Sequence, residues 1–219
     1  MFASVSGTRS NISLSSDVHF ALSSQVPPTC SSVFIDALDS RTTRLNLLER
    51  TCNQVDYTVF DFSRFTQLEE LCIANNSFLF VDQFRLEGFP ALRAVCIGSN
   101  CFTKEKYRYT KNLARSFCVQ KCPRLEAIRI YERSFIDYSG EFVVAQLPAL
   151  RVLTIGDLNR DSYNFFYCST FTLKSSSRCS REDSHADLPQ LQSVSLGKFC
   201  FQNSVHTIFQ SRKQGKRGM

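Results

Sequence analysis

The chain has 219 residues, of which 43% are hydrophobic and 21% are charged, and its formal net charge is +6. These proportions are those of an ordinary soluble domain, and they exclude a wholly disordered chain, a collagen-like fibre and a coiled coil. Two features are unusual, because the chain contains 20 Phe without any Trp and also contains 10 Cys.

The first segment, residues 1–28, is rich in serine, and we expect it to be disordered. It lacks the apolar core of a secretory signal peptide. No stretch of the chain has the roughly 18 to 20 consecutive apolar residues of a membrane span. Unless the chain is part of a longer product, these features predict a cytoplasmic protein with reduced cysteines. A repeat array is predicted for residues 29–210, followed by a basic tail at 211–219.

A repeated motif runs through most of the chain. Apolar residues recur at the first, fourth and sixth positions of five segments. These copies begin at Leu68, Leu92, Leu125, Leu150 and Leu191, and a weaker copy begins at Thr42. Four of the copies also carry Phe at the eleventh position, namely Phe78, Phe102, Phe135 and Phe201. The alternating apolar residues predict one short strand in each copy, and stacking of equivalent strands predicts a parallel sheet.

A second alternating segment precedes four of the copies. These segments are residues 59–62, 83–86, 116–119 and 141–144. They are too short and too rich in Phe and Val for a helix, so we expect short extended pieces. Pro90, Pro123, Pro148 and Pro189 each stand two residues before the first Leu of a copy. Proline disfavours helical backbone in the residue before it, and here it turns the chain toward the main strand.

The repeated motif resembles the leucine-rich repeat family over residues 42–210. With Phe near the end of four copies, the motif is similar to the BspA-like repeats of bacteria and protists. The opening Cys122-Pro123-x-Leu125 resembles the cysteine-containing repeats of F-box proteins. The resemblance implies a β-rich repeat solenoid. This solenoid is a right-handed superhelix with one parallel sheet on its concave face and short extended or 3-10 segments on its convex face.

The resemblance also implies a structural role for the ninth position of the copies. Asn76 and Asn100 match the buried asparagines of the family, whose amides bond to the backbone between copies. The same position is Arg133, Leu158 and Phe199 in the other three copies, which interrupts such a ladder of asparagines.

Unequal spacing between the copies predicts two inserts. Neighbouring copies are 24 to 26 residues apart, except for 33 residues between Leu92 and Leu125 and 41 between Leu150 and Leu191. The excess residues lie near 104–115 and 174–187, and we expect loops there. The first insert and the tail each carry a charge of +4, whereas the repeat body outside both inserts carries −2.

The basic insert and tail allow two interpretations. Tyr107 and Tyr109 interleave with cations in the insert, as in some surfaces that bind RNA or anionic lipid. The second interpretation is a solvated loop and a solubilising tail. We favour it because a nucleic-acid partner would call for a basic concave face.

Catalytic motifs are missing, and the sequence contains 3 His. It lacks a nucleophile elbow, a phosphate loop, a zinc-protease motif and a dinucleotide fingerprint, so we predict neither enzymatic activity nor a cofactor. The pairs Cys96-x4-Cys101 and Cys118-x3-Cys122 come near metal-ligand spacing. Cys122, however, occupies a position that is apolar in other copies, which favours buried structural thiols over a metal site.

Cys72 and Cys96 share an outward position on adjacent predicted strands, about 5 Å apart. They can be reactive thiols, a disulfide, or ordinary exposed thiols. We favour the last because the sequence places no evident basic group near them to lower a pKa.

The predicted concave face carries small side chains and charges of both signs. We therefore predict a non-enzymatic scaffold that binds a protein partner there. The candidate binding residues are Arg93, Glu126, Arg129, Tyr131, Arg151 and Asp157, with Arg129, Tyr131 and Arg151 as the anchor. Two alternatives stay open: the recognition part of a larger assembly such as a ubiquitin-ligase adaptor, and an RNA or anionic-surface binder that uses the basic insert and tail.

Overall fold

The computed structural model describes residues 38–104, 112–175, 188–204 and 206–211. Eleven strands and no helix occur in these ranges. The strands are β1 (Arg44–Leu47), β2 (Glu70–Ile73), β3 (Gln83–Glu87), β4 (Ala94–Ile97), β5 (Ser116–Gln120), β6 (Ala127–Ile130), β7 (Glu141–Ala145), β8 (Val152–Ile155), β9 (Thr170–Ser175), β10 (Ser193–Leu196) and β11 (His206–Ser211). The predicted Ser-rich segment 1–28, most of both inserts and nearly all of the basic tail lie outside the described residues.

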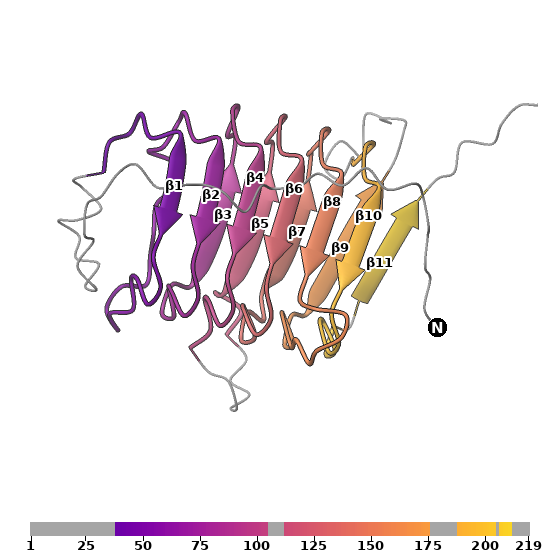
Figure 1. Ribbon diagram of the computed structural model, residues 1–219. Helices are drawn as coiled ribbons and strands as arrows, with labels where there is room; N and C mark the ends of the chain where they lie inside the picture. The colour runs from indigo at the N-terminus through magenta and orange to yellow at the C-terminus, as the bar shows by residue number, and fades with distance from the viewer. Residues whose placement is uncertain (1–37, 105–111, 176–187, 205, 212–219) are drawn as a thin grey trace, which may run out of the picture.

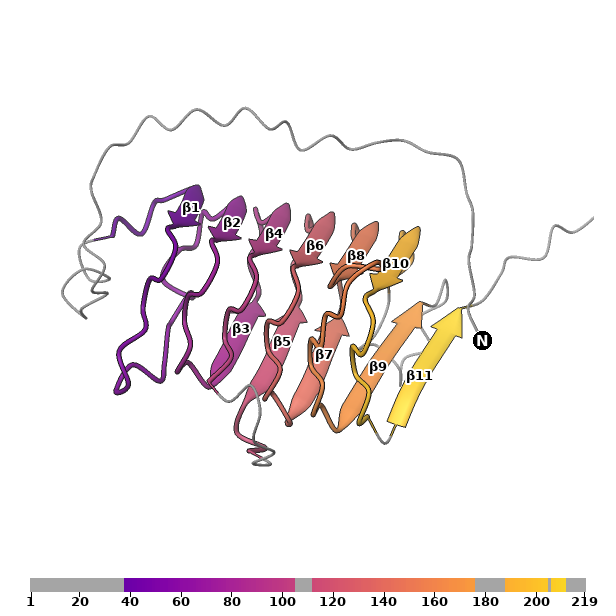
Figure 2. The same ribbon diagram turned by 60° about the horizontal axis from the view of Figure 1, so that its bottom comes forward.

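The strands form two parallel sheets (Figure 1). The first sheet has six strands in the order β1-β2-β4-β6-β8-β10, and the second has five in the order β11-β9-β7-β5-β3. From β2 onward, successive strands alternate between the sheets, so each copy of the motif adds one strand to each of them. Figure 2 shows the two sheets as facing layers. This arrangement confirms a β-rich chain of parallel strands and is compatible with a repeat fold.

The second sheet is more regular than the sequence predicts. The segments expected to be short extended or 3-10 pieces pair into one continuous sheet, in which Phe84, Phe117 and Phe142 share one register. Parallel pairing satisfies backbone groups that isolated extended pieces would leave without partners. Residues 59–62, also expected to be a short extended piece, are not part of a strand. Phe60 and Phe62 in that segment are nevertheless buried.

Stacked phenylalanines run through the space between the sheets, among buried Leu, Ile and Val side chains. One ladder consists of Phe78, Phe102, Phe135, Phe165 and Phe201, with neighbouring ring centroids 4.7–5.1 Å apart and ring planes within 5°. A second ladder, Phe84, Phe117 and Phe142, rises from the second sheet. Rings of one ladder meet rings of the other edge to face, which is a favourable aromatic geometry. The high Phe content therefore builds the core.

The turn after each first-sheet strand has an unusual backbone. Two residues, separated by one, lie at positive φ in each turn. These pairs are Arg50 and Cys52, Asn76 and Phe78, Asn100 and Phe102, Arg133 and Phe135, Tyr163 and Phe165, and Phe199 and Phe201. Asn76 and Asn100 are only partly buried, so the expectation of buried family asparagines is wrong. Asparagine suits this position because it tolerates left-handed backbone better than most residues.

One turn is displaced relative to its expected position. In the copy that begins at Leu150, Tyr163 and Phe165 occupy the two left-handed positions. Leu158, which the spacing predicted for the first of them, is instead 61% exposed. This turn contains five extra residues, so Phe165 does not fall at the eleventh position of the motif. Part of the additional length that the spacing assigned to residues 174–187 therefore lies in this turn.

A row of small polar side chains lies between the two left-handed positions. It consists of Thr51, Ser77, Cys101, Ser134, Asn164 and Cys200. The hydroxyl of Ser134 accepts the Cys101 N–H at 3.0 Å and donates to the Gly98 carbonyl at 2.6 Å. The Asn164 amide donates to the Tyr131 carbonyl at 2.7 Å. Cys101 and Cys200 therefore belong to a hydrogen-bonded turn ladder, which accounts for two of the thiols structurally.

Candidate functional site

The outer face of the first sheet carries one central row of side chains. Alternation along each strand turns Leu and Ile inward and leaves the intervening residue outward. In strand order this row reads Asn46, Cys72, Cys96, Arg129, Thr154 and Ser195, each in register with the next. The predicted residue Arg129 therefore lies in the middle of the sheet, between Cys96 and Thr154. Its Nε is buried and makes no hydrogen bond.

Three predicted residues gather where the first-sheet strands start. Backbone hydrogen bonds of 2.7–2.9 Å link Glu69, Arg93, Glu126, Arg151 and Gln192 in that order. We call these five residues the strand-start row. Its charges alternate in sign along the four charged members, and Arg93 and Arg151 are exposed. Glu126 and Arg151 also border a shallow hollow of about 250 Å³ together with Pro123 and Pro148.

The other two predicted residues lie where the strands end. Tyr131 and Asp157 line a shallow depression of about 500 Å³ beside Glu132 and Arg160. The Arg160 Nη1 lies 3.6 Å from Glu132 Oε1, and its Nε lies 3.9 Å from Asp157 Oδ2. Tyr131 is 46% exposed, which is high for an aromatic ring. We call this depression the strand-end hollow.

The proposed three-residue anchor is therefore not one cluster. Arg129 lies on β6 and Tyr131 directly follows that strand, whereas Arg151 aligns with Glu126 at the opposite end. Sequence reasoning missed Arg160, because it lies in the five-residue insertion that displaces a turn. An interrupted motif spacing was the signal that pointed to this segment.

Cys72 and Cys96 also line the strand-end hollow. They are paired in register on β2 and β4, as predicted, and both are free thiols. A hydrogen bond from the Cys96 thiol lowers the pKa of Cys72 to about 7, and the same interaction raises the pKa of Cys96. Arg129 neighbours Cys96 and favours its thiolate. The expectation that no basic group stands near the pair is therefore wrong.

The other described cysteines behave differently. Burial raises the pKa of Cys101 to about 12 and that of Cys168 and Cys200 to about 11. Cys122 is fully buried, as its repeat position predicted, and burial raises its pKa too. Cys52 is disulfide-bonded, so the expectation of reduced cysteines is wrong for this residue. Among the free cysteines that the structure describes, Cys72 alone has a lowered pKa.

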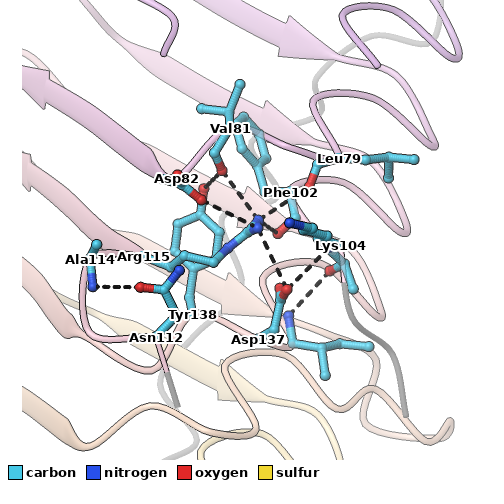
Figure 3. A network of polar contacts seen from close by, with 12 residues as sticks. Leu79, Val81, Asp82, Phe102, Lys104, Asn112, Ala114, Arg115, Asp137 and Tyr138 are labelled. Atoms are coloured by element: carbon cyan, nitrogen blue, oxygen red, sulfur yellow. Dashed lines mark hydrogen bonds and ion pairs between the residues drawn. The ribbon is translucent and has the colours of Figure 1, made fainter. Parts of the chain in front are cut away.

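The first insert is less basic on its surface than the sequence suggests. Arg115, counted there as a solvated cation, is only 2% exposed. Its Nη2 donates to the carbonyls of Leu79, Val81 and Phe102 at 3.0–3.2 Å. These contacts tie the end of the insert to the core (Figure 3). Residues 105–111, with both interleaved tyrosines, lie outside the described part.

Charged and aromatic groups complete the surroundings of Arg115. Its Nη1 lies 3.5 Å from Asp82 Oδ1 and 3.6 Å from Asp137 Oδ2. Its guanidinium lies 4.8 Å from the ring centroid of Tyr138. A buried charge needs such partners, so this arginine stabilises the fold and is not available to a ligand.

The described residues contain no group of three His, Cys, Asp or Glu side chains arranged to hold a metal ion. In the same part of the chain, no helix has the length and hydrophobicity that a membrane crossing needs. Comparison of the chain with protein-family models found no match, and comparisons with curated proteins and with solved structures found none either.

Proposed function

We propose that the chain is a leucine-rich-repeat-like solenoid that acts without catalysis and binds a protein partner on the outer face of the first sheet. The observation that carries the proposal is the composition of this face. It presents exposed Tyr131 and Arg151 among small side chains, beside two shallow hollows. Tyrosine and arginine are the side chains that most often anchor protein interfaces.

The shape of the face supports a macromolecular partner over a small molecule. Small-molecule sites are concave and bury most of their ligand, whereas both hollows here are shallow and lined by charges. The alternating signs of the strand-start row favour a partner segment that itself carries both acidic and basic side chains. A uniformly charged polymer such as RNA would meet Glu69 and Glu126 as well as the arginines.

An affinity-capture experiment with matched variants tests the proposal. The intact chain and the variants Tyr131→Ala and Arg151→Ala are used as bait in cell extract, and captured proteins are quantified by mass spectrometry. Arg85→Ala and Lys121→Ala, which alter exposed residues of the second sheet or its end, serve as controls. We expect a specific protein that the intact chain captures to be reduced at least tenfold with the Tyr131→Ala and Arg151→Ala baits and retained by the controls.

Two outcomes contradict the proposal. Equal capture by all five baits would show that the first-sheet face is not the binding surface. Equal loss from the control variants would place binding elsewhere. Thermal unfolding of each variant checks that every bait is folded.

A further inference from the structure

Cys72 and Cys96 have the arrangement that a reversible disulfide requires. They lie directly opposite each other on neighbouring parallel strands, and both are free. Neighbouring strands are about 4.8 Å apart, which is within the range of Cα separations that a disulfide can bridge. Both thiols line the open strand-end hollow, so a small reagent can reach them.

We propose that Cys72 and Cys96 form a dithiol modification site that a low-molecular-weight disulfide, such as oxidised glutathione, converts reversibly into a disulfide. The Cys72 thiolate attacks one sulfur of the reagent, a Cys72–glutathione bond forms, and one glutathione thiolate leaves and takes a proton from water. Cys96 then gives its proton to water and attacks the Cys72 sulfur, and a second glutathione leaves. The two protein thiols lose two electrons in total, and the reagent gains them as two reduced glutathiones.

The two cysteines have different roles in this sequence because their surroundings differ. Cys72 is exposed, whereas Cys96 is half-buried. A thiolate is the attacking species, and the hydrogen bond from Cys96 favours the thiolate of Cys72. Arg129 lies on the other side of Cys96 and favours its thiolate once Cys72 is modified. Glu70, on the same strand as Cys72, disfavours the negative charge of the Cys72 thiolate.

The sheet also explains why the disulfide is readily reduced. Side chains on neighbouring parallel strands keep a Cβ separation close to the strand spacing of about 4.8 Å, while disulfides prefer about 3.8 Å. Closing the bond therefore strains the sheet locally. Strained and exposed disulfides have more oxidising potentials and belong to the labile class. The modification does not depend on the proposed protein partner.

The test uses the full chain, oxidised glutathione at neutral pH, acid quenching and mass spectrometry of non-reduced peptides. We expect a Cys72–Cys96 disulfide, with Cys72 reacting about tenfold faster than the half-buried thiol Cys118 on the second sheet. Trypsin leaves Cys96 and Cys101 on one peptide, so fragment ions must identify the bonded sulfur. Reduced glutathione in excess should restore both thiols.

Two variants separate the roles of the pair. In Cys96→Ser, we expect Cys72 to keep a stable glutathione adduct, because the resolving thiol is gone. In Cys72→Ser, we expect Cys96 to stay reduced on the same time scale. The control Cys118→Ser should form the Cys72–Cys96 disulfide at the unaltered rate. The proposal is overturned if Cys72 reacts no faster than Cys118, or if the wild-type chain accumulates the glutathione adduct without forming the internal disulfide.

Discussion

Phe102 and Phe135 stack with their ring centroids 4.7 Å apart and their planes within 5° of parallel, although 32 residues separate them in the chain. Both residues have left-handed backbone, at φ 53° and φ 60°. The separation of the rings matches the spacing of neighbouring strands, so the turn places one ring of the ladder per strand. Edge-to-face contacts with Phe84 and Phe117 hold the stack from the side.

The centre of this ladder should be a major source of stability. Phe135 is fully buried and contacts rings on both sides as well as Tyr138. Phe135→Ala should lower the free energy of unfolding by about 3–5 kcal/mol, because it removes buried area and leaves a cavity. Urea denaturation measures the change. Val59→Ala, at an exposed position, should stay within about 0.5 kcal/mol, and a similarly small effect at Phe135 would contradict the role of the ladder.

Substitution of the buried Arg115 should destabilise the fold by a similar amount. Arg115→Met keeps much of the side-chain volume but removes the charge that faces Asp82 and Asp137. The expected loss is about 3–5 kcal/mol in the free energy of unfolding, because a buried carboxylate then lacks its nearby cation. Lys121→Ala, which breaks an exposed ion pair with Glu87, should cost at most about 1 kcal/mol. Equal costs for the two variants would contradict a structural role for Arg115.

The left-handed backbone at position 76 explains why asparagine is suited to it, and substitutions at Asn76 test this explanation. Asn76 has φ 59°, which glycine adopts freely and β-branched residues avoid. Asn76→Val should therefore destabilise the chain by about 1–2 kcal/mol, whereas Asn76→Gly should be nearly neutral. Asn46→Val on the exposed face of β1 is the control, with an expected change within about 0.5 kcal/mol. Thermal unfolding of the three variants gives the comparison.

The reactivity of Cys72 should depend on pH near neutrality. Its pKa is lowered to about 7 by the hydrogen bond from Cys96, and the thiolate forms as the pH rises through that value. The rate of Cys72 alkylation should therefore rise between about pH 6 and pH 8 and then level off. Asn46, Glu70 and Cys96 are the groups that face it from its own and neighbouring strands, with Arg129 one strand further.

Two substitutions at Cys96 identify the origin of this shift. Cys96→Ala removes the hydrogen-bond donor and should move the midpoint of the alkylation profile toward about 8.5, the value of an ordinary thiol. Cys96→Ser keeps a donor and should leave the midpoint closer to 7. Alkylation rates of Cys72, measured by mass spectrometry at a series of pH values, give the midpoint for each variant. An unchanged midpoint in Cys96→Ala would show that the hydrogen bond is not the cause.

Much of the first sheet could be predicted because its pattern is local. The apolar residues of each copy alternate with period two, and this alternation places β1, β2, β4, β6, β8 and β10 without reference to other copies. The pairing of Cys72 with Cys96 followed from their shared fifth position in two neighbouring copies. The second sheet was predicted only as short extended pieces. These segments become strands only when their neighbours supply hydrogen-bond partners.

The displaced turn and the buried arginine could not be predicted in this way. An insertion of five residues breaks the motif, so neither Phe165 nor Arg160 was recognised, although the structure returns Phe165 to the ladder. Arg115 looks like one more cation in a basic loop. Its burial depends on carbonyls and carboxylates that are 13 to 36 residues away in the chain.

The alternation of inward and outward residues, the repeated strand positions and the Phe-rich core can be deduced from the sequence, since each depends on spacing within a single copy. The tertiary structure was needed to show how the chain accommodates its insertions. It returned Phe165 to the phenylalanine ladder after the five-residue insertion, and it buried Arg115 among carbonyls and carboxylates from distant parts of the chain. The physical reason is that register between strands depends on the backbone hydrogen bonds of the whole stack, and insertions of unequal length conceal that register in the linear chain.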